Sequence, residues 1–265
     1  MKKNLNITVS PEILTSKKKN KSLFQRIISR FFSPLIYRIS YSYDKYLFRN
    51  NSYDQSFNWN WEEVNYNRNA LINSFVNLFE SPKYLEIGCD NNSLFNSVSI
   101  IDKIGVDPNN GGTHRMTSDE FFKEFKGSIN VVFIDGLHTY EQARRDFVNA
   151  LKHIDSDGGF IAFHDMLPND WIEQHVPLIS RGAWTGDVWK LAFELKDTFN
   201  SDFKIIRADY GLGVVRINRD NRNKELKDYS ENLEEAQFDY LFNNIQDLPI
   251  YDWQDFNKWL KSLKV

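Results

Sequence analysis

Short, uninterrupted apolar segments alternate with helix-like segments through the middle of the chain, and this alternation constrains the fold most strongly. Strands that lack polar alternation are buried on both faces, so the pattern predicts a parallel sheet with helices on each side. The predicted elements are strands at 83–88, 103–108, 129–135 and 160–165, and helices at 61–79, 118–125, 140–154 and 186–195.

Two further strands are predicted at 203–208 and 211–217. The turn between them is too short for the crossover that parallel neighbours need, so the two strands should form an antiparallel hairpin. The tail beyond residue 220 is charged and then has helical spacing. The sequence therefore predicts a mostly parallel sheet that closes with an antiparallel hairpin.

Residues 1–50 differ in charge from the rest of the chain. They contain eleven Lys and Arg against two acids, a net charge of +9, which leaves −12 for residues 51–265. A basic leader followed by the amphipathic stretch "KSLFQRIISRFF" (21–32) could contact an anionic membrane surface or an acidic partner. A helix packed on its own domain is the simpler interpretation. The acidic body argues against nucleic acid as a partner.

The cysteine content and the N-terminus indicate the compartment. The one cysteine, Cys89, excludes an intramolecular disulfide and is typical of a reducing environment. No secretory signal is visible, and the apolar run "FFSPLIY" is too short to cross a bilayer. We therefore expect a cytoplasmic protein. Cys89 has no base nearby in sequence, so it is not a candidate nucleophile.

Ionisable residues follow two neighbouring predicted strands. Asp135 ends one strand and is followed by His138, while His164 and Asp165 end the next. Because the carboxyl ends of parallel strands meet at one edge of the sheet, where such folds bind ligands, the four side chains should converge. Each residue alone could be a structural loop residue, but the four together favour a functional site.

His138 is expected beside the start of a helix. Thr139 and Gln142 have the spacing of a capping box, so this helix should begin just after His138. The partial positive charge of a helix N-terminus disfavours imidazolium. We therefore expect His138 to be neutral at working pH and able to serve as a general base.

Four stretches of the chain carry a family resemblance: "YLEIGCDNN", "IGVDPNNGGTHRMTSDEFF", "VVFIDGLHTYEQARRDFVNALKHIDSDGGFIAFHDMLP" and "GDVWK". Together they resemble the class I S-adenosylmethionine-dependent methyltransferases, and most of all the bacterial small-molecule and sugar O-methyltransferases. The resemblance covers about residues 80–215 and implies an α/β fold, a doubly wound, mostly parallel seven-stranded sheet ending in an antiparallel hairpin, with N- and C-terminal helical additions.

The resemblance also suggests boundaries along the chain. We expect a disordered basic leader at 1–20, a helical extension at 21–80, a methyltransferase core at 81–218 and a C-terminal helical tail at 219–265. The extra N-terminal helices could cover the acceptor site or form the interface of a homo-oligomer.

S-adenosylmethionine is the cofactor that the resemblance implies. Gly88 would let the chain turn off the first strand, and Glu86 would accept hydrogen bonds from the ammonium group of the cofactor. Asp107, 21 residues after Glu86, could accept both ribose hydroxyls, a contact that any nucleoside cofactor needs. The glycine fingerprint of a dinucleotide fold is absent.

Further residues are assigned to the cofactor from the same resemblance. Ser118 and Asp119 resemble the segment that meets the adenine, although Ser118 could equally be a helix N-cap. Asp135 is included as well. Many methyltransferases have two more glycines in the first loop, where this chain has Asp90 and Asn92.

The acceptor implied by the resemblance is a small polyhydroxylated molecule, such as a sugar or glycan precursor. Its hydroxyl must lose a proton as it attacks, so His138 is assigned as general base with Asp135 beside it as a second catalytic residue. Asp135, His164 and Asp165 could hold Mg²⁺ or another divalent metal, although Mg²⁺ prefers oxygen ligands.

Two substrate contacts and two other functions complete the expectations. Trp184 could stack on a sugar ring, and Asp187 is assigned to the substrate from the resemblance. A nicotinamide-dependent oxidoreductase remains open, although the missing glycine fingerprint disfavours it. A non-catalytic binding module with the methyltransferase fold also remains open because of Asp90 and Asn92.

Overall fold

The computed structural model describes residues 41–227 and 233–263. The chain divides into two compact units, Met1–Leu47 and Phe48–Val265, which are treated separately. Residues 41–47 of the first unit are described, and they are helical. The predicted leader at 1–20 and the amphipathic stretch at 21–32 lie outside the described residues.

The second unit is built on a seven-stranded sheet with the order β2-β1-β3-β4-β6-β5-β7. Neighbours from β2 to β4 pair in parallel, β6 is antiparallel to both β4 and β5, and β7 is parallel to β5. The predicted mostly parallel sheet with its antiparallel hairpin is therefore confirmed. The strands are β1 (Tyr84–Ile87), β2 (Lys103–Val106), β3 (Val131–Ile134), β4 (Gly159–Phe163), β5 (Phe203–Ile206), β6 (Leu212–Ile217) and β7 (Ile250–Tyr251).

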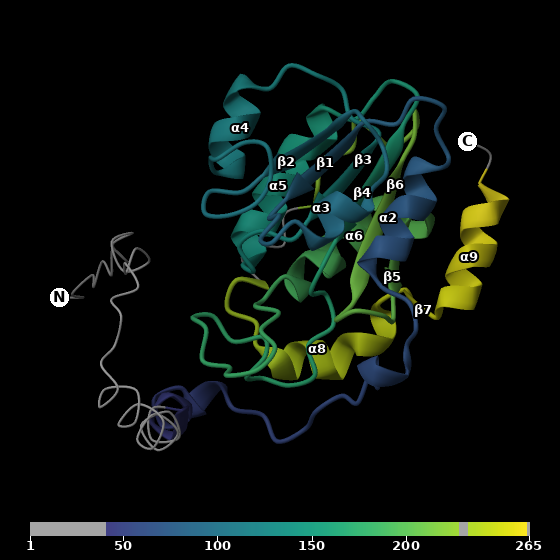
Figure 1. Cartoon of the computed structure of the whole chain (residues 1–265). Helices are drawn as coiled ribbons and strands as arrows, with labels where there is room; N and C mark the ends of the chain where they lie inside the picture. Colours follow the sequence, from purple (N-terminus) through teal and green to yellow (C-terminus); the bar gives the residue numbers. More distant parts are fainter. Residues whose placement is uncertain (1–40, 228–232, 264–265) are drawn as a thin grey trace, which may run out of the picture. The chain divides into compact units, whose positions relative to one another are not determined.

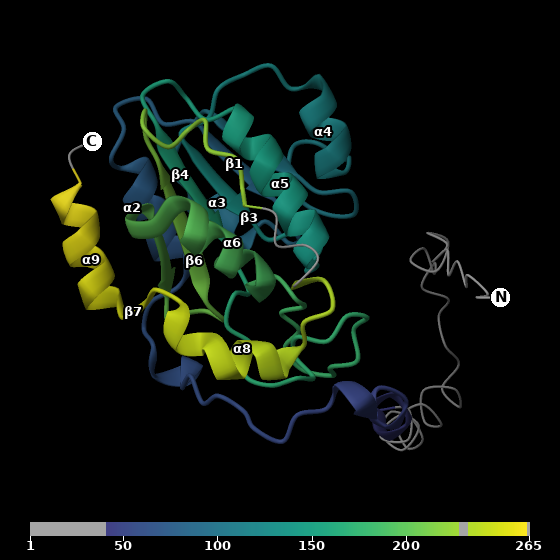
Figure 2. The ribbon, with the colours of Figure 1, turned by 180° about the vertical axis from the view of Figure 1, so that it is seen from behind.

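Helices cover both faces of this sheet (Figures 1 and 2), and each face has its own core. Alternation along β1 shows how the sequence divides between them, because Leu85 and Ile87 join one core while Tyr84 joins the other. One face is covered by α4 (Ser118–Glu124), α5 (Tyr140–Lys152), α6 (Trp189–Phe199) and α8 (Phe238–Asn244), and the other by α2 (Arg68–Val76), α3 (Ser93–Ser97) and α9 (Trp253–Ser262).

Two elements differ from the sequence-based expectation. The helix predicted at 61–79 is shorter, because α2 begins only after Asn67, whose side chain accepts from the backbone N–H groups of Asn69 and Ala70. A 3₁₀ turn, η3 (Trp61–Glu63), precedes it. The expected helical tail also contributes β7, which pairs with β5 at the edge of the sheet.

The segment before α2 is fastened to the sheet domain by backbone and aromatic contacts. Phe57 N–H donates to the carbonyl of Asn169 at 2.8 Å, and Trp59 Nε1 donates to the carbonyl of Pro168 at 3.0 Å. These contacts bring the start of α2 to the edge of the sheet where the parallel strands end. Within the described ranges, no helix combines the length and apolarity needed to cross a membrane.

Candidate active site

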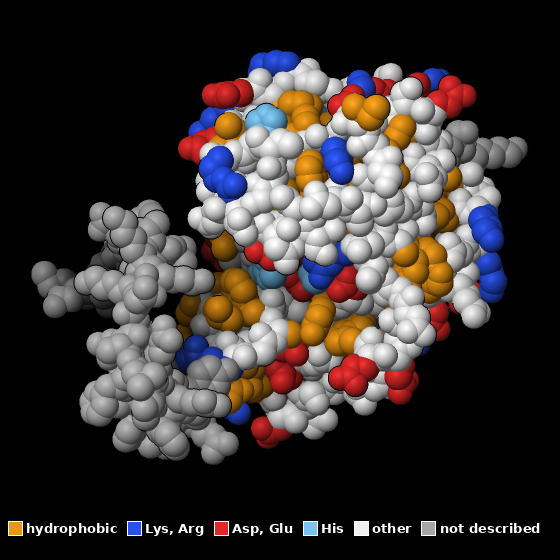
Figure 3. Space-filling model, in the orientation of Figure 1, with side chains coloured by type: hydrophobic (Ala, Val, Ile, Leu, Met, Phe, Trp, Pro, Cys, Tyr) orange, Lys and Arg blue, Asp and Glu red, His pale blue; other side chains and the backbone are white. Residues whose placement is uncertain are grey.

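A pocket of about 750 Å³ lies at the carboxyl ends of β1 to β4, within the size range of small-molecule sites. Figure 3 shows a hollow on this face where acidic, basic and histidine side chains gather. A smaller pocket of about 350 Å³ adjoins it and contains Glu86. Of the residues proposed from sequence, the larger pocket is lined by Gly88, Asp107, Ser118, Asp119, Asp135, His138, His164, Asp165 and Trp184.

The loop after β1 requires an unusual backbone at three positions. Gly88 has a φ of +85°, and a Cβ at this position would lie 2.0 Å from the carbonyl oxygen of Asp135, so only glycine fits. Asp90 and Asn92 have φ values of 43° and 64°. They therefore adopt the left-handed conformation that a glycine would favour, and Asp and Asn tolerate it better than most residues.

Asp107 connects the loops after β1 and β2. Its Oδ2 accepts from the backbone N–H groups of Cys89 and Asp90, both at 3.0 Å, and its Oδ1 accepts from those of Asn109 and Asn110, both at 2.8 Å. Burial opposes ionisation, but these four donors lower the pKa of Asp107. The four hydrogen bonds use the acceptor capacity of the carboxylate, so a ribose could bind here only by replacing some of them.

Glu86 is buried beside Tyr84 on β1. The Tyr84 hydroxyl donates to Glu86 Oε2 at 2.5 Å, and both side chains face the same side of the strand. Burial raises the pKa of Glu86 to about 7, and the nearby charge of Asp135 adds to this effect. Glu86 can therefore change its charge near neutral pH.

The start of α4 forms a second polar wall. Thr117, not Ser118, is the N-cap of α4 and forms a capping box with Glu120. This leaves the Ser118 hydroxyl free to accept from Gln142 Nε2 at 3.2 Å. The same Nε2 atom lies 3.0 Å from Asp146 Oδ1.

Thr139 is the N-cap of α5, so the helix begins just after it as predicted, and the Thr139 side chain accepts from Gln142 N–H. In the expected capping box the Gln142 side chain would bond back to the backbone of Thr139. Its Nε2 instead donates to Ser118 Oγ and Asp146 Oδ1. Burial raises the pKa of Asp146 to about 6. Gln142 lines the large pocket and was not predicted as a site residue, because its only sequence signal was the helix cap.

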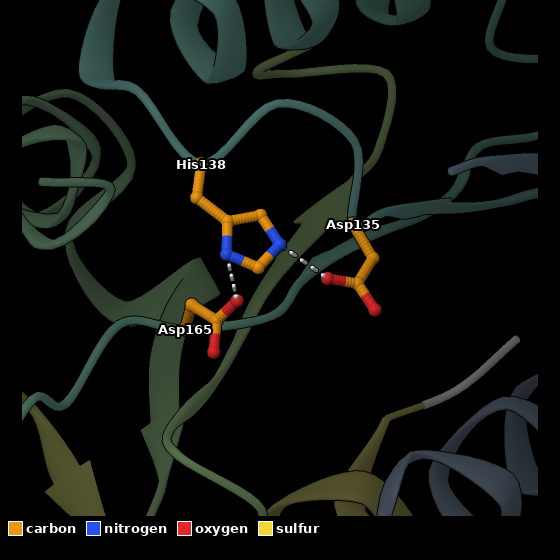
Figure 4. A group of neighbouring side chains, drawn as sticks. All are labelled: Asp135, His138 and Asp165. Atoms are coloured by element: carbon orange, nitrogen blue, oxygen red, sulfur yellow. Dashed lines mark ion pairs between the residues drawn. The ribbon is translucent and has the colours of Figure 1, made fainter. Parts of the chain in front are cut away.

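His138 lies between two carboxylates (Figure 4). Its Nε2 is 3.4 Å from Asp135 Oδ1, and its Nδ1 is 3.1 Å from Asp165 Oδ2. The Nδ1–H group donates to the backbone carbonyl of Trp184 at 2.8 Å, and the two rings stack with centroids 5.1 Å apart. The predicted convergence of strand-end side chains is thus seen directly.

The pKa of His138 is shifted by more than the helix N-terminus considered from sequence. Burial lowers its pKa, but the hydrogen bond and charge of Asp135 and the charge of Asp165 raise it above its usual value. The direction of this shift is opposite to the one expected from the helix N-terminus alone. The two neighbouring carboxylates outweigh the helix dipole because they carry full charges at contact distance.

Asp135 and His164 form the other half of the charged cluster. Burial disfavours the ionised Asp135, but His164, His138 and Arg68 together lower its pKa. His164 Nδ1 lies 2.9 Å from Asp165 Oδ1 and 3.4 Å from Asp135 Oδ1. These carboxylates raise the pKa of His164 well above its usual value despite its burial.

Besides Gln142, three further residues at this site were not predicted from the sequence. Arg68, at the start of α2, and Tyr210, in the β5–β6 turn, line the large pocket, and Asp209 of the same turn lines the smaller one. Two of these residues, Asp209 and Tyr210, have positive φ values of 47° and 60°, as does the predicted Asp165 at 64°. Backbone strain of this kind concentrates at functional sites, although it cannot be recognised in a single sequence.

The two residues assigned to the substrate lie in different surroundings. Trp184 lines the large pocket, with one ring face against His138 and its Nε1 donating to the carbonyl of His175 at 2.9 Å. Asp187 lines neither pocket described here. Its Oδ1 accepts from Tyr140 N–H at 2.7 Å, and its Oδ2 pairs with Lys190 at 3.0 Å. In this structure Asp187 therefore caps α5.

The donor set fits a divalent cation. The set expected from sequence was Asp135, His164 and Asp165. The three ligand atoms that lie within 4.8 Å of one another belong instead to Asp135, His138 and Asp165. Within the described chain, His164 Nδ1 and Asp165 Oδ2 are buried and lack an aligned hydrogen-bond partner. Two carboxylates and an imidazole suit a metal that accepts mixed oxygen and nitrogen ligands better than they suit Mg²⁺.

Comparison with known proteins locates a recognised domain in this chain. Residues 82–166 match a family described as a methyltransferase domain. No curated protein sequence matches the chain. The matched segment spans β1 to the end of β4 and includes Asp107, Asp135, His138 and Asp165.

Solved structures provide distant likenesses. The MycE methyltransferase of the mycinamycin biosynthetic pathway, in complex with Mg and SAH, is 15% identical with a TM-score of 0.38, covering 54% of this chain and 47% of its own. An O-methyltransferase from Bacillus cereus in complex with SAH is 11% identical with a TM-score of 0.40, covering 72% and 96%. Spermidine synthase from Thermotoga maritima is 17% identical with a TM-score of 0.35, covering 64% and 71%. The chain thus spans about half the length of MycE.

The matched segment and the sheet order agree. Residues 82–166 match a methyltransferase domain, and the sheet has the mostly parallel order with an antiparallel hairpin that the resemblance implied. The family match does not support the nicotinamide-dependent alternative.

Proposed function

We propose that the protein is an S-adenosylmethionine-dependent O-methyltransferase that acts on a hydroxyl of a small polyhydroxylated acceptor, such as a sugar or glycan precursor. The observation that supports this proposal is the position of His138. It lies on the wall of the same 750 Å³ pocket that Gly88, Asp107 and Ser118 line. A base and a nucleoside-sized site thus share one cavity, as methyl transfer to a hydroxyl requires.

His138 would accept the proton of the acceptor hydroxyl at Nε2. Its Nδ1–H is engaged by the carbonyl of Trp184, so Nε2 is the ring nitrogen left for this task. Asp135 Oδ1, 3.4 Å from Nε2, would stabilise the imidazolium that forms. When bound, the cofactor supplies the electrophilic methyl group, and its positive charge would lower the pKa of His138 toward a value suited to a base.

The remaining residues would bind and orient. Glu86 in the smaller pocket is proposed for the cofactor's ammonium group, and Ser118 with Asp119 for its adenine. Asp107 is proposed for its ribose, whose hydroxyls would replace some of the four backbone N–H groups that now donate to this carboxylate. Asp135, His164 and Asp165 would hold a divalent metal, which would polarise the acceptor hydroxyl.

Labelled S-adenosylmethionine and a panel of nucleotide sugars and glycans would test the proposal, with and without a chelator. Mass spectrometry should find one added methyl group on an acceptor. Fragmentation that places the methyl group on an oxygen, together with stability to base, would identify an ether rather than an N-methyl amine or an ester. Transfer to an amine or a carboxylate, with none to any hydroxyl, would contradict it. Binding of S-adenosylmethionine without transfer to any acceptor would favour the binding-module alternative.

The wider context of the protein is also proposed from sequence. It comprises a cytoplasmic location, assembly into a homo-oligomer, and contact of the basic N-terminus with an anionic membrane surface as the alternative to a helix packed on its own domain. The segment boundaries expected after residues 20, 80 and 218 are proposals of the same kind. Sedimentation of the full chain, with and without vesicles of anionic phospholipid, would test the assembly and the membrane contact together.

A further inference from the structure

Arg68 occupies a position that local rules disfavour. It is the first residue of α2, where the helix dipole favours acidic side chains over basic ones. Its own backbone N–H donates to Asp209 Oδ2 at 3.0 Å, so an acid from the β5–β6 turn compensates for the placement. A local rule that is broken and then compensated in this way often marks a functional residue.

The guanidinium of Arg68 binds two acids of the site. Its Nε and Nη2 donate to Asp209 at 2.8 and 3.0 Å, and its Nη1 donates to Asp135 Oδ2 at 2.5 Å. Nη2 also contacts Nε2 of His164. Among the residues at 41–227 and 233–263, Arg68 is the one Lys or Arg that lines either pocket.

This arrangement gives the two oxygens of Asp135 different partners. Arg68 holds Oδ2, while Oδ1 faces His138 and His164, each at 3.4 Å. Asp135 is also a member of the cluster that could hold a metal ion. A divalent ion at that cluster would therefore share a ligand with a guanidinium, and the two positive charges would repel each other.

We propose that Arg68 is the built-in cation of this site: it neutralises Asp135 and Asp209, presents Oδ1 of Asp135 to His138, and weakens divalent-cation binding by the Asp135–His138–Asp165 cluster. Arg68 is a positioning residue in this assignment. The inference uses the proposed function only to identify Asp135 as a site residue. Cation binding can be measured without cofactor or acceptor, so the two proposals can fail separately.

Mn²⁺ binding to the full chain tests this, with free Mn²⁺ measured by electron paramagnetic resonance. Arg68→Met and Arg68→Gln should bind Mn²⁺ about tenfold tighter than the unmodified protein, because each removes a unit charge close to the cluster. Arg68→Lys keeps the charge and should stay within about threefold of it. Adding Asp135→Asn to Arg68→Met should abolish the gain.

Arg207→Met is the matched control, since Arg207 pairs with Asp252 at 2.6 Å and both residues are exposed. It should leave Mn²⁺ affinity unchanged. Circular dichroism and thermal melting would establish that each variant is folded. If both uncharged variants bind Mn²⁺ no tighter than the unmodified protein, or if Arg68→Lys gains as much as they do, Arg68 is only a structural residue. A gain that survives Asp135→Asn would also overturn the assignment.

Discussion

Gly186 lies directly against the backbone of His138. A Cβ at Gly186 would lie 1.7 Å from the carbonyl oxygen of His138, and its φ is +58°. Two residues earlier, the carbonyl of Trp184 accepts from His138 Nδ1. The loop between β4 and α6 therefore holds the imidazole in place from outside the segment that matches the methyltransferase domain.

Gly186→Ala should impair methyl transfer without impairing cofactor binding. The added methyl group must displace the backbone of His138, so kcat should fall by about tenfold or more, as expected for a small misplacement of a catalytic group. Affinity for S-adenosylmethionine, measured by calorimetry, should change by less than about twofold because the cofactor wall is untouched. Gly182→Ala, in the same loop, is the control, because no atom lies within 4 Å of its added Cβ.

His138→Ala should lower turnover by about 10²- to 10⁴-fold, the usual contribution of a general base. Cofactor affinity should remain nearly intact, because the proposed cofactor contacts lie on other residues. Steady-state kinetics and calorimetry on the same preparation would measure both quantities. Equal losses in turnover and cofactor affinity would count against the assignment of His138 as base.

Cofactor affinity should depend on pH through Glu86. With a pKa of about 7, Glu86 is neutral in more acidic solution and cannot pair with an ammonium group. The dissociation constant should therefore fall as pH rises toward 7, by up to about tenfold per unit. Above about pH 8 the amino group of the cofactor loses its own proton, so the gain should end there. In Glu86→Gln the pH dependence of the dissociation constant below pH 7 should disappear. If this dependence persists, a group other than Glu86 causes it.

Asp146→Asn should stabilise the protein at alkaline pH. Burial raises the pKa of Asp146 from 3.8 to about 6, so the folded state favours the protonated form. Stability from this group is thus present below pH 3.8 and is lost as pH rises toward 6. At pH 8 the uncharged asparagine should raise the free energy of unfolding by about 2 kcal/mol, with a smaller effect at pH 5. Urea unfolding at both pH values measures this, and an equal effect at both would exclude the ionisation of Asp146 as its cause.

Much of the sheet was predictable because each central strand is a short apolar run. In β3 and β4 every residue is buried, and such runs stand out in a sequence. The limits of α2 were harder to predict, since apolar spacing continues upstream of Asn67 and only its cap decides where the helix begins. β7 has two residues and depends on pairing with β5, more than forty residues earlier, so it has no local signal.

The charged site was predicted in part for a similar reason. Asp135, His138, His164 and Asp165 follow adjacent strands, and topology alone brings them together. Arg68 and Asp209 come from elements on either side of the matched segment, and their pairing depends on how α2 packs beside the β5–β6 turn. No spacing rule connects residues 141 positions apart in the chain.

β7 has a further consequence for how the protein tolerates truncation. β7 pairs with the edge of β5 that faces away from β6. There Ile205 N–H donates to the carbonyl of Pro249 and Arg207 N–H donates to that of Tyr251, both at 2.9 Å. A chain that stopped before Ile250 would leave β5, with the sequence FKII, as an unpaired edge strand. Its free backbone groups could then pair with strands of other copies. The pairing of β7 with β5 therefore shields this edge of the sheet from strands of other copies.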